Sequence, residues 1–223
     1  VKRVTAIINA QGNRVEVYHD VFAGNNALSK ADAVVLLVRH VNLLQARVNG
    51  ATYRELLKLP QMPVDEAIRL KSVMAQNLQS NYSSMFTAYV SWSPSNSDSL
   101  RVILNERRQL LRDFLLSDQN YEWLLDWADN QNGVKPLYLK DFWLPEASNA
   151  DSVKVRGAYT KAGELHIHNL LDEIRSAFAD SQEYRIKRAE FDRWYWSERK
   201  NAWQSFAWSF PQGESLLQTE AQW

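Results

Sequence analysis

The chain has 223 residues, of which 45% are hydrophobic, so it is long enough for one domain, or two small ones, with a real core. Basic and acidic residues balance at 26 each, which excludes a global basic field that would hold a nucleic acid backbone. The sequence has no cysteine, which excludes disulfides, thiolate metal sites and cysteine nucleophiles.

Membrane-spanning and targeting signals are missing from the sequence. The longest apolar run, residues 33–38, is far shorter than the ~20 residues of a membrane span, and there is no signal peptide. We therefore expect no direct membrane insertion by these residues. The chain begins at Val1 without methionine, so we expect a piece of a larger protein whose anchor or export signal lies elsewhere.

The first part of the chain predicts an extended element and then a helix. Residues 4–18 alternate loosely in polarity, which predicts a weak hairpin or an extended arm. Ser29 is suited to cap a helix whose apolar residues recur at helical spacing up to Val48. Asn49 and Gly50 predict the left-handed end of that helix.

Two further helices are predicted before a polar linker. Thr52 and Glu55 have the spacing of a capping box for a short helix. Pro63 suits the first turn of the next helix, whose apolar pattern continues to about Ser91. Residues 92–97 are polar and contain proline, which makes them the best internal boundary.

The second part of the chain predicts four helices and one small β element. The predicted helices cover residues 98–116, 120–131, 160–178 and 182–210. Residues 137–139 and 153–155 have strand-like composition. Thr160, after Gly157, is predicted to cap its helix. Low glycine and proline content also favours long helices.

These elements predict a mostly α fold with a small β element and two helical subdomains. The N-terminal subdomain covers residues 1–92 and begins with the arm or hairpin. The C-terminal, aromatic-rich subdomain covers residues 97–223 and contains the β element around 134–157.

Two pairs of polar residues were weighed as sites. His166 and His168 are two apart, which on a helix points them about 200° away from each other, so we expect partly exposed histidines and no metal site. Asp126 and Asp129 can share a helix face, where a solvated carboxylate face is the better interpretation.

Enzyme and cofactor motifs do not occur in the sequence. There is no G-x-x-x-x-G-K-[ST] phosphate loop, no G-x-G-x-x-G and no G-x-S-x-G, so we expect no catalytic residues, no cofactor and no metal. The charged and aromatic run 185–200 is interspersed with acidic residues, which disfavours nucleic acid binding.

The nine tryptophans are the unusual feature of the composition. A stripe that includes Phe191, Trp194, Trp203, Phe206 and Phe210 has the spacing of a buried helix face. Nine tryptophans exceed what a small core easily buries, so we expect some at interfaces, where tryptophan is enriched. The candidates for protein interaction are Trp92, Trp143, Trp196 and Trp208.

From Leu110 onward the order of landmarks resembles one family, the IcmF/VasK/TssM-type proteins of type VI secretion. Six short motifs follow one another in the family's order over about half the chain, and a tryptophan closes the series. They are residues 123–128 (WLLDWA), 137–143 (LYLKDFW), 157–163 (GAYTKAG), 191–195 (FDRWY), 202–206 (AWQSF) and 210–213 (FPQG), followed by Trp223. The family more often has phenylalanine where Tyr159 stands.

The resemblance implies the periplasmic part of a large bacterial inner-membrane protein that also has a cytoplasmic nucleotide-binding-like domain. The family's periplasmic part reaches towards an outer-membrane lipoprotein and assembles with a smaller inner-membrane partner, while its β-rich lipoprotein-binding region lies C-terminal to motifs like these. We therefore expect a scaffold that supports effector secretion, with these subunits and further copies of itself as partners.

Two other functions stay open at this point. The runner-up is a soluble helical adaptor that binds a peptide or a partner helix in a Trp-lined groove. The third is an enzyme with an unrecognised site. A buried polar cluster in a deep pocket favours the enzyme, and flat exposed aromatic patches favour the scaffold or the adaptor.

Overall fold

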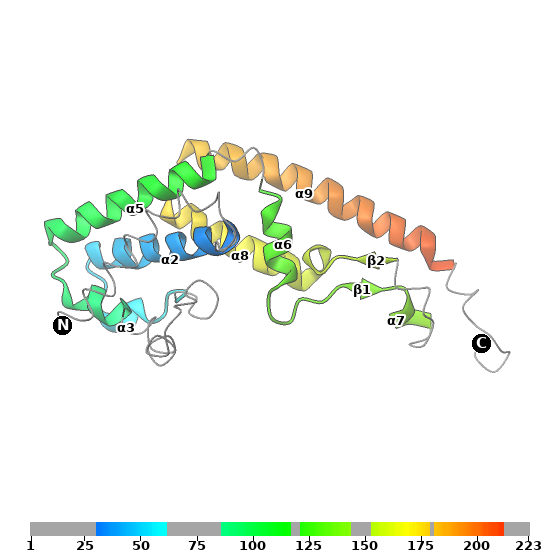
Figure 1. The fold of residues 1–223 in the computed structure, drawn as a ribbon, viewed down its shortest axis with the longest axis horizontal. Helices are drawn as coiled ribbons and strands as arrows, with labels where there is room; N and C mark the ends of the chain where they lie inside the picture. The colour runs from blue at the N-terminus through cyan, green and yellow to red at the C-terminus, as the bar shows by residue number, and fades with distance from the viewer. Residues whose placement is uncertain (1–29, 62–85, 117–120, 144–152, 179–180, 212–223) are drawn as a thin grey trace, which may run out of the picture. The chain divides into compact units, whose positions relative to one another are not determined.

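The computed structural model describes residues 30–61, 86–116, 121–143, 153–178 and 181–211 (Figure 1). This part of the chain is mostly helical, with a small two-stranded antiparallel sheet, which confirms the predicted fold class. The expected hairpin at 4–18, the Ser29 cap and most of the expected helix 63–91 lie outside the described residues. The last residues of that helix, 86–92, are helical.

Helices α2 (Lys30–Val48) and α5 (Asp98–Leu116) pack side by side at the centre of the first of two compact units (Figure 1). α2 is apolar on nearly all sides, and many of its side chains are fully buried. They include Val34, Leu37, Val38, Val41 and Leu43. α5 is amphipathic and buries one stripe, made of Leu100, Leu104, Leu111, Phe114 and Leu115. Burial of these apolar faces is the main stabilising force in this unit.

The end of α2 and the start of the next helix follow the sequence signals. Gly50 has φ 95°, the left-handed conformation that ends a helix. Helix α3 (Tyr53–Leu56) begins after Thr52, whose backbone N–H donates to a Glu55 carboxylate oxygen at 2.7 Å. The Thr52 hydroxyl also donates to that oxygen, at 2.8 Å, so the predicted capping box is confirmed.

The first unit comprises residues 1–119 and 173–180, and the second comprises residues 120–172 and 181–223. This division differs from the expected subdomains 1–92 and 97–223, because α5 packs against α2. The first unit therefore includes the end of helix α8 (Lys161–Ala177). There Arg39 Nε donates to a Glu173 carboxylate oxygen at 3.0 Å, and Asn42 donates to the Glu173 carbonyl at 2.9 Å. Independent folding of the two expected subdomains stays a prediction.

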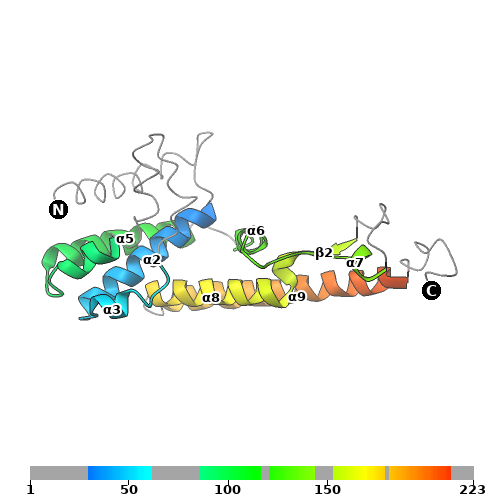
Figure 2. The ribbon, with the colours of Figure 1, turned by 90° about the horizontal axis from the view of Figure 1, so that it is seen from below.

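The second unit combines helices with a short β ribbon. Its elements are α6 (Trp123–Asp129), β1 (Leu137–Tyr138), α7 (Lys140–Trp143), β2 (Lys154–Val155), the 3₁₀ turn η2 (Gly157–Tyr159), most of α8, and α9 (Gln182–Ser209). Leu137 pairs with Val155, and Tyr138 pairs with Lys154, so both predicted strands are confirmed. In Figure 2, α6 and the ribbon lie on the same side of α9.

The longest helix, α9, buries fewer residues than the predicted stripe contains. Phe191 and Phe206 are buried, whereas Trp194 and Trp203 are half-buried and Phe210 is 37% exposed. The stripe is therefore core in its middle, and the interpretation as core is wrong for Phe210, which lies at the helix C-cap. No helix within the described ranges is both long enough and apolar enough to cross a bilayer.

Candidate functional site: a docked turn and exposed tryptophans

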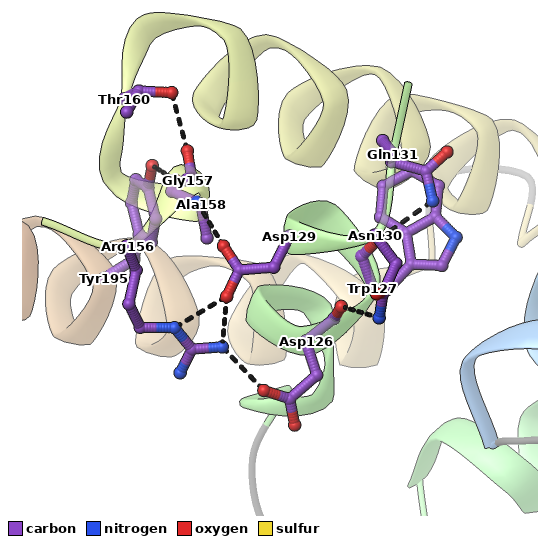
Figure 3. Close-up of polar contacts among 10 residues, drawn as sticks. All are labelled: Asp126, Trp127, Asp129, Asn130, Gln131, Arg156, Gly157, Ala158, Thr160 and Tyr195. Carbon is purple, nitrogen blue, oxygen red and sulfur yellow. Dashed lines mark hydrogen bonds and ion pairs between the residues drawn. The ribbon is translucent and has the colours of Figure 1, made fainter. Parts of the chain in front are cut away.

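The turn at Gly157–Tyr159 connects the β ribbon to α8 (Figure 3). Thr160 has extended backbone and directly precedes α8; its Oγ1 accepts from the Gly163 N–H at 3.3 Å, which confirms the predicted cap. The same hydroxyl donates to the Gly157 carbonyl at 2.6 Å. One side chain therefore closes the turn and begins the helix.

Glycines 157 and 163 are required by close backbone approach. A Cβ on Gly163 would lie 2.5 Å from Ala158 Cα and would overlap the Gly157 carbonyl oxygen. A Cβ on Gly157 would lie 2.7 Å from a methyl carbon of Val134. The first turn of α8 thus packs directly on the 3₁₀ turn, with no room for a side chain between them.

Asp129 binds the turn from α6 (Figure 3). One carboxylate oxygen accepts from the Ala158 N–H at 2.6 Å, and the other accepts from Arg156 Nε at 2.8 Å. Arg156 also donates to Asp126 at 2.6 Å. Asp126 is 80% exposed at its side chain, but Asp129 is only 31% exposed, so the expected solvated face is wrong for Asp129.

The charge on Arg156 is balanced by these two carboxylates. Burial by itself lowers the pKa of Arg156, but hydrogen bonds and attraction from Asp126 and Asp129 outweigh it and raise the pKa above its ordinary value. Both acids therefore serve a fixed arginine that orders the turn. This arrangement has no side chain placed for proton transfer to a substrate.

Three side chains of α9 bind the backbone of the same turn. The Tyr195 hydroxyl donates to the Ala158 carbonyl at 2.8 Å. The Tyr159 carbonyl accepts from Arg199 Nε at 2.9 Å and from Trp203 Nε1 at 3.0 Å. These donors are spaced by four residues along α9, so they lie on one face and fix the register of the helix against the turn.

A second set of contacts joins α8 to α9. Arg188 donates to the Asp192 carboxylate at 2.9 Å, and its Nη2 lies 2.8 Å from His168 Nδ1. Because arginine only donates, His168 Nδ1 is the acceptor. The Tyr184 hydroxyl donates to the Leu171 carbonyl, and burial raises the pKa of Tyr184 to about 12. This link makes His168 part of a polar network between two helices.

The predicted histidine pair does not converge on one point. His168 lies against Arg188, whereas the His166 ring lies 6.4 Å from the ring of Trp127. Within the described ranges no group of three or more His, Cys, Asp or Glu side chains could hold a metal ion.

The four interaction candidates differ in exposure. Trp208 is 77% exposed and Trp92 is 65% exposed. Trp196 is 43% exposed, and the Arg199 guanidinium lies 5.0 Å from its ring centroid, so this ring is partly held in place. Trp143 is the last residue of α7, and its side chain lies outside the description. Trp92 belongs to the first unit, and the other three belong to the second.

Sequence reasoning missed the arginines that order the turn, Arg156 and Arg199. A signal for Arg199 was available, since Tyr195, Arg199 and Trp203 recur at a spacing of four residues and share a helix face. Arg156 carries no comparable signal, because its two partners lie 27 and 30 residues away in sequence. No protein-family model, curated protein or solved structure matches this chain.

Proposed function

We propose that this chain is a structural periplasmic segment of a type VI secretion membrane complex. It supports effector secretion by linking inner-membrane and outer-membrane components. The observation that carries the proposal is that the motifs of the resemblance contact one another. The turn of residues 157–163 accepts hydrogen bonds from Tyr195 and Trp203, which belong to two later motifs, and Arg156 beside it binds Asp126 of an earlier one.

A connected set of motifs favours a structural role for them. Residues that resemble a family by chance would have no reason to meet in one hydrogen-bonded cluster. Here the motifs supply the capping threonine, the glycine at the close approach and the donors from α9. Their task in the proposed scaffold is to hold α9 rigidly against the rest of the second unit.

A rigid α9 suits a protein that transmits position between membranes. At a rise of 1.5 Å per residue, its 28 residues extend ~42 Å. Side chains fix it at two levels, near Arg188 and near Arg199. The proposed scaffold works through protein contacts and performs no catalysis.

Its contacts to other subunits, and to further copies of the chain, are assigned to the exposed tryptophans. Tryptophan is enriched in interface hot spots because it combines a large apolar surface with one hydrogen-bond donor. Trp208, the most exposed of the candidates with a described side chain, lies near the end of α9.

The test is type VI secretion by cells whose full-length protein carries changes in this segment. Deletion of residues 1–223 should abolish secretion. Trp208→Ser combined with Trp196→Ser should reduce secretion at least ~10-fold, as expected when hot spots of ~1–2 kcal/mol each are removed. Leu165→Ser is the control, because Leu165 is equally apolar and 60% exposed in the same unit but is no interaction candidate.

Normal secretion by cells lacking the whole segment would overturn the proposal. Equal losses for the tryptophan pair and for Leu165→Ser would remove the tryptophans from it. Protein levels in the membrane fraction must be equal across the strains, so that a loss reflects contacts and not degradation.

A further inference from the structure

The β ribbon has one face packed and one face turned outward. β2 packs against α9, and Val155 is fully buried. Because side chains alternate along a strand, the neighbouring pair Tyr138 and Lys154 lies on the opposite face from Leu137 and Val155. Tyr138 is half-buried and Lys154 is exposed, so this outward face is open to a partner.

Two lysines concentrate positive charge on the ring of Tyr138. The Lys140 ammonium lies 5.2 Å from the ring centroid, and the Lys154 ammonium lies 5.8 Å from it. Both distances fit a cation–π contact. The two ammoniums can be no farther apart than the sum of these distances, which is comparable to a Debye length of ~8 Å at physiological salt. A carboxylate placed between them would therefore be attracted by both.

The nearest described acidic groups have other partners. The Asp141 carboxylate accepts the Tyr138 backbone N–H at 2.9 Å, and Asp126 and Asp129 bind Arg156. Because Asp141 occupies the outward N–H of β1, a partner strand cannot use that group to extend the sheet. A ligand of this ribbon is instead held by side chains on its outward face.

We propose that Tyr138, Lys140 and Lys154 form a docking face for a short acidic segment of a protein partner. Carboxylates of the segment lie between the two ammoniums, and its apolar atoms lie on the Tyr138 ring. A short peptide fits better than nucleic acid, since the whole chain has zero formal net charge and offers no broad basic surface for a polyanion. The inference shares with the proposed function only the idea of a protein partner, so the two can fail separately.

The test is fluorescence anisotropy with the purified 223-residue chain and a labelled probe peptide of six glutamates flanked by glycine. The glutamate peptide should bind with a sub-millimolar Kd at 50 mM salt and more weakly at 300 mM, whereas the same peptide with glutamines should not bind. Lys140→Gln with Lys154→Gln should weaken binding ~10-fold, because two partly exposed ion pairs contribute up to ~1 kcal/mol each.

Controls separate this face from general basicity. Lys161→Gln removes an exposed lysine at the start of α8 and should leave the Kd within ~2-fold of the parent, since it lies outside the docking face. Tyr138→Phe keeps the ring and should bind normally, whereas Tyr138→Ser should bind more weakly. Circular dichroism must give the same thermal midpoint for every variant compared.

Several results would overturn the inference. They are equal binding of the glutamate and glutamine peptides, an unchanged Kd in the double lysine variant, and binding of polyphosphate or single-stranded DNA but not of the peptide. Binding that appears only after Glu146→Gln and Asp151→Asn would also contradict it, because the chain's own acids would then neutralise the face.

Discussion

Two long helices of this chain are held in place by different forces. In the first unit, α2 buries apolar side chains on nearly all sides, among them Val34, Leu37 and Val41. In the second unit, the 28-residue α9 buries only four of its described side chains and is fixed by polar groups that bind the backbone of a turn. Apolar burial is non-directional, whereas hydrogen bonds from Tyr195 and Trp203 specify one register.

The difference teaches where the two units should be sensitive. A core such as that around α2 loses stability in proportion to the apolar volume removed. A helix docked through hydrogen bonds onto a close-packed turn should instead fail when the geometry of the turn changes, even by one methyl group. The following variants test this contrast from the largest expected effect to the smallest.

Gly163→Ala should be the most damaging change. The added methyl overlaps backbone atoms of Gly157 and Ala158, which cannot move without displacing the turn. We expect a loss of more than ~4 kcal/mol in the free energy of unfolding, measured by urea denaturation with tryptophan fluorescence. Gly50→Ala is the control: nothing lies within 4 Å of the new methyl, and the left-handed φ alone costs about 1 kcal/mol. Equal losses in the two variants would contradict the close packing described here.

Leu37→Ala tests the apolar side of the comparison. Leu37 is fully buried in α2, so the truncation should cost about 3 kcal/mol through lost burial and an internal cavity. The exposed Val102 of α5 serves as the control, and Val102→Ala should change stability by less than ~0.5 kcal/mol. A loss below 1 kcal/mol for Leu37→Ala would mean that α2 is not a core helix.

Acid should weaken the first unit through His40. Burial and then the charge of Arg107 lower the pKa of His40 from 6.5 to about 3, so the folded protein keeps this imidazole neutral. The unfolded chain takes up a proton below pH 6.5, so the stability from His40 is complete above that pH and is lost as pH falls towards 3. The expected loss between pH 7 and pH 4 is about 3 kcal/mol.

Denaturant titrations of the parent and of His40→Leu at several pH values provide the measurement. Acidic residues also contribute to the slope with pH, so the informative quantity is the difference between the two proteins. If that difference stays constant from pH 7 to pH 4, His40 is not held neutral by burial.

Trp203→Phe should have the smallest effect, because it removes the indole N–H and keeps most of the aromatic surface. The Tyr159 carbonyl retains its bond from Arg199, so we expect a loss of about 1 kcal/mol from one hydrogen bond. Trp194→Phe changes a second half-buried tryptophan of α9 and isolates the effect of ring size. A hydrogen-bond role for Trp203 requires the larger loss in Trp203→Phe.

Helices and their ends were largely predictable, because their signals are local. The predicted helix 98–116 has the bounds that α5 has in the structure, and Gly50 and Thr160 end and begin helices as their residue types indicate. Each depends on residues within a few positions in sequence. The β ribbon was likewise indicated by two short strand-like runs on either side of a turn-rich segment.

The packing partners of those elements could not be predicted. The apolar stripe of α5 indicates which of its faces is buried but not that α2 covers it, so the expected boundary at 93–96 was drawn between two segments that pack together. The pairing of Asp129 with Arg156 is equally invisible, since it depends on a fold that brings distant residues together. Local sequence fixes the elements, whereas long-range contacts determine the cluster.

Photo-crosslinking in cells tests the scaffold proposal most directly. A photoreactive amino acid would replace Trp208 in the full-length protein of a secreting strain, and a second strain would carry it at exposed Arg101 of α5. The proposal predicts that position 208 gives an adduct with an identified membrane-complex subunit or with a second copy of the chain, while position 101 gives little. No adduct with either from position 208 in actively secreting cells would contradict it.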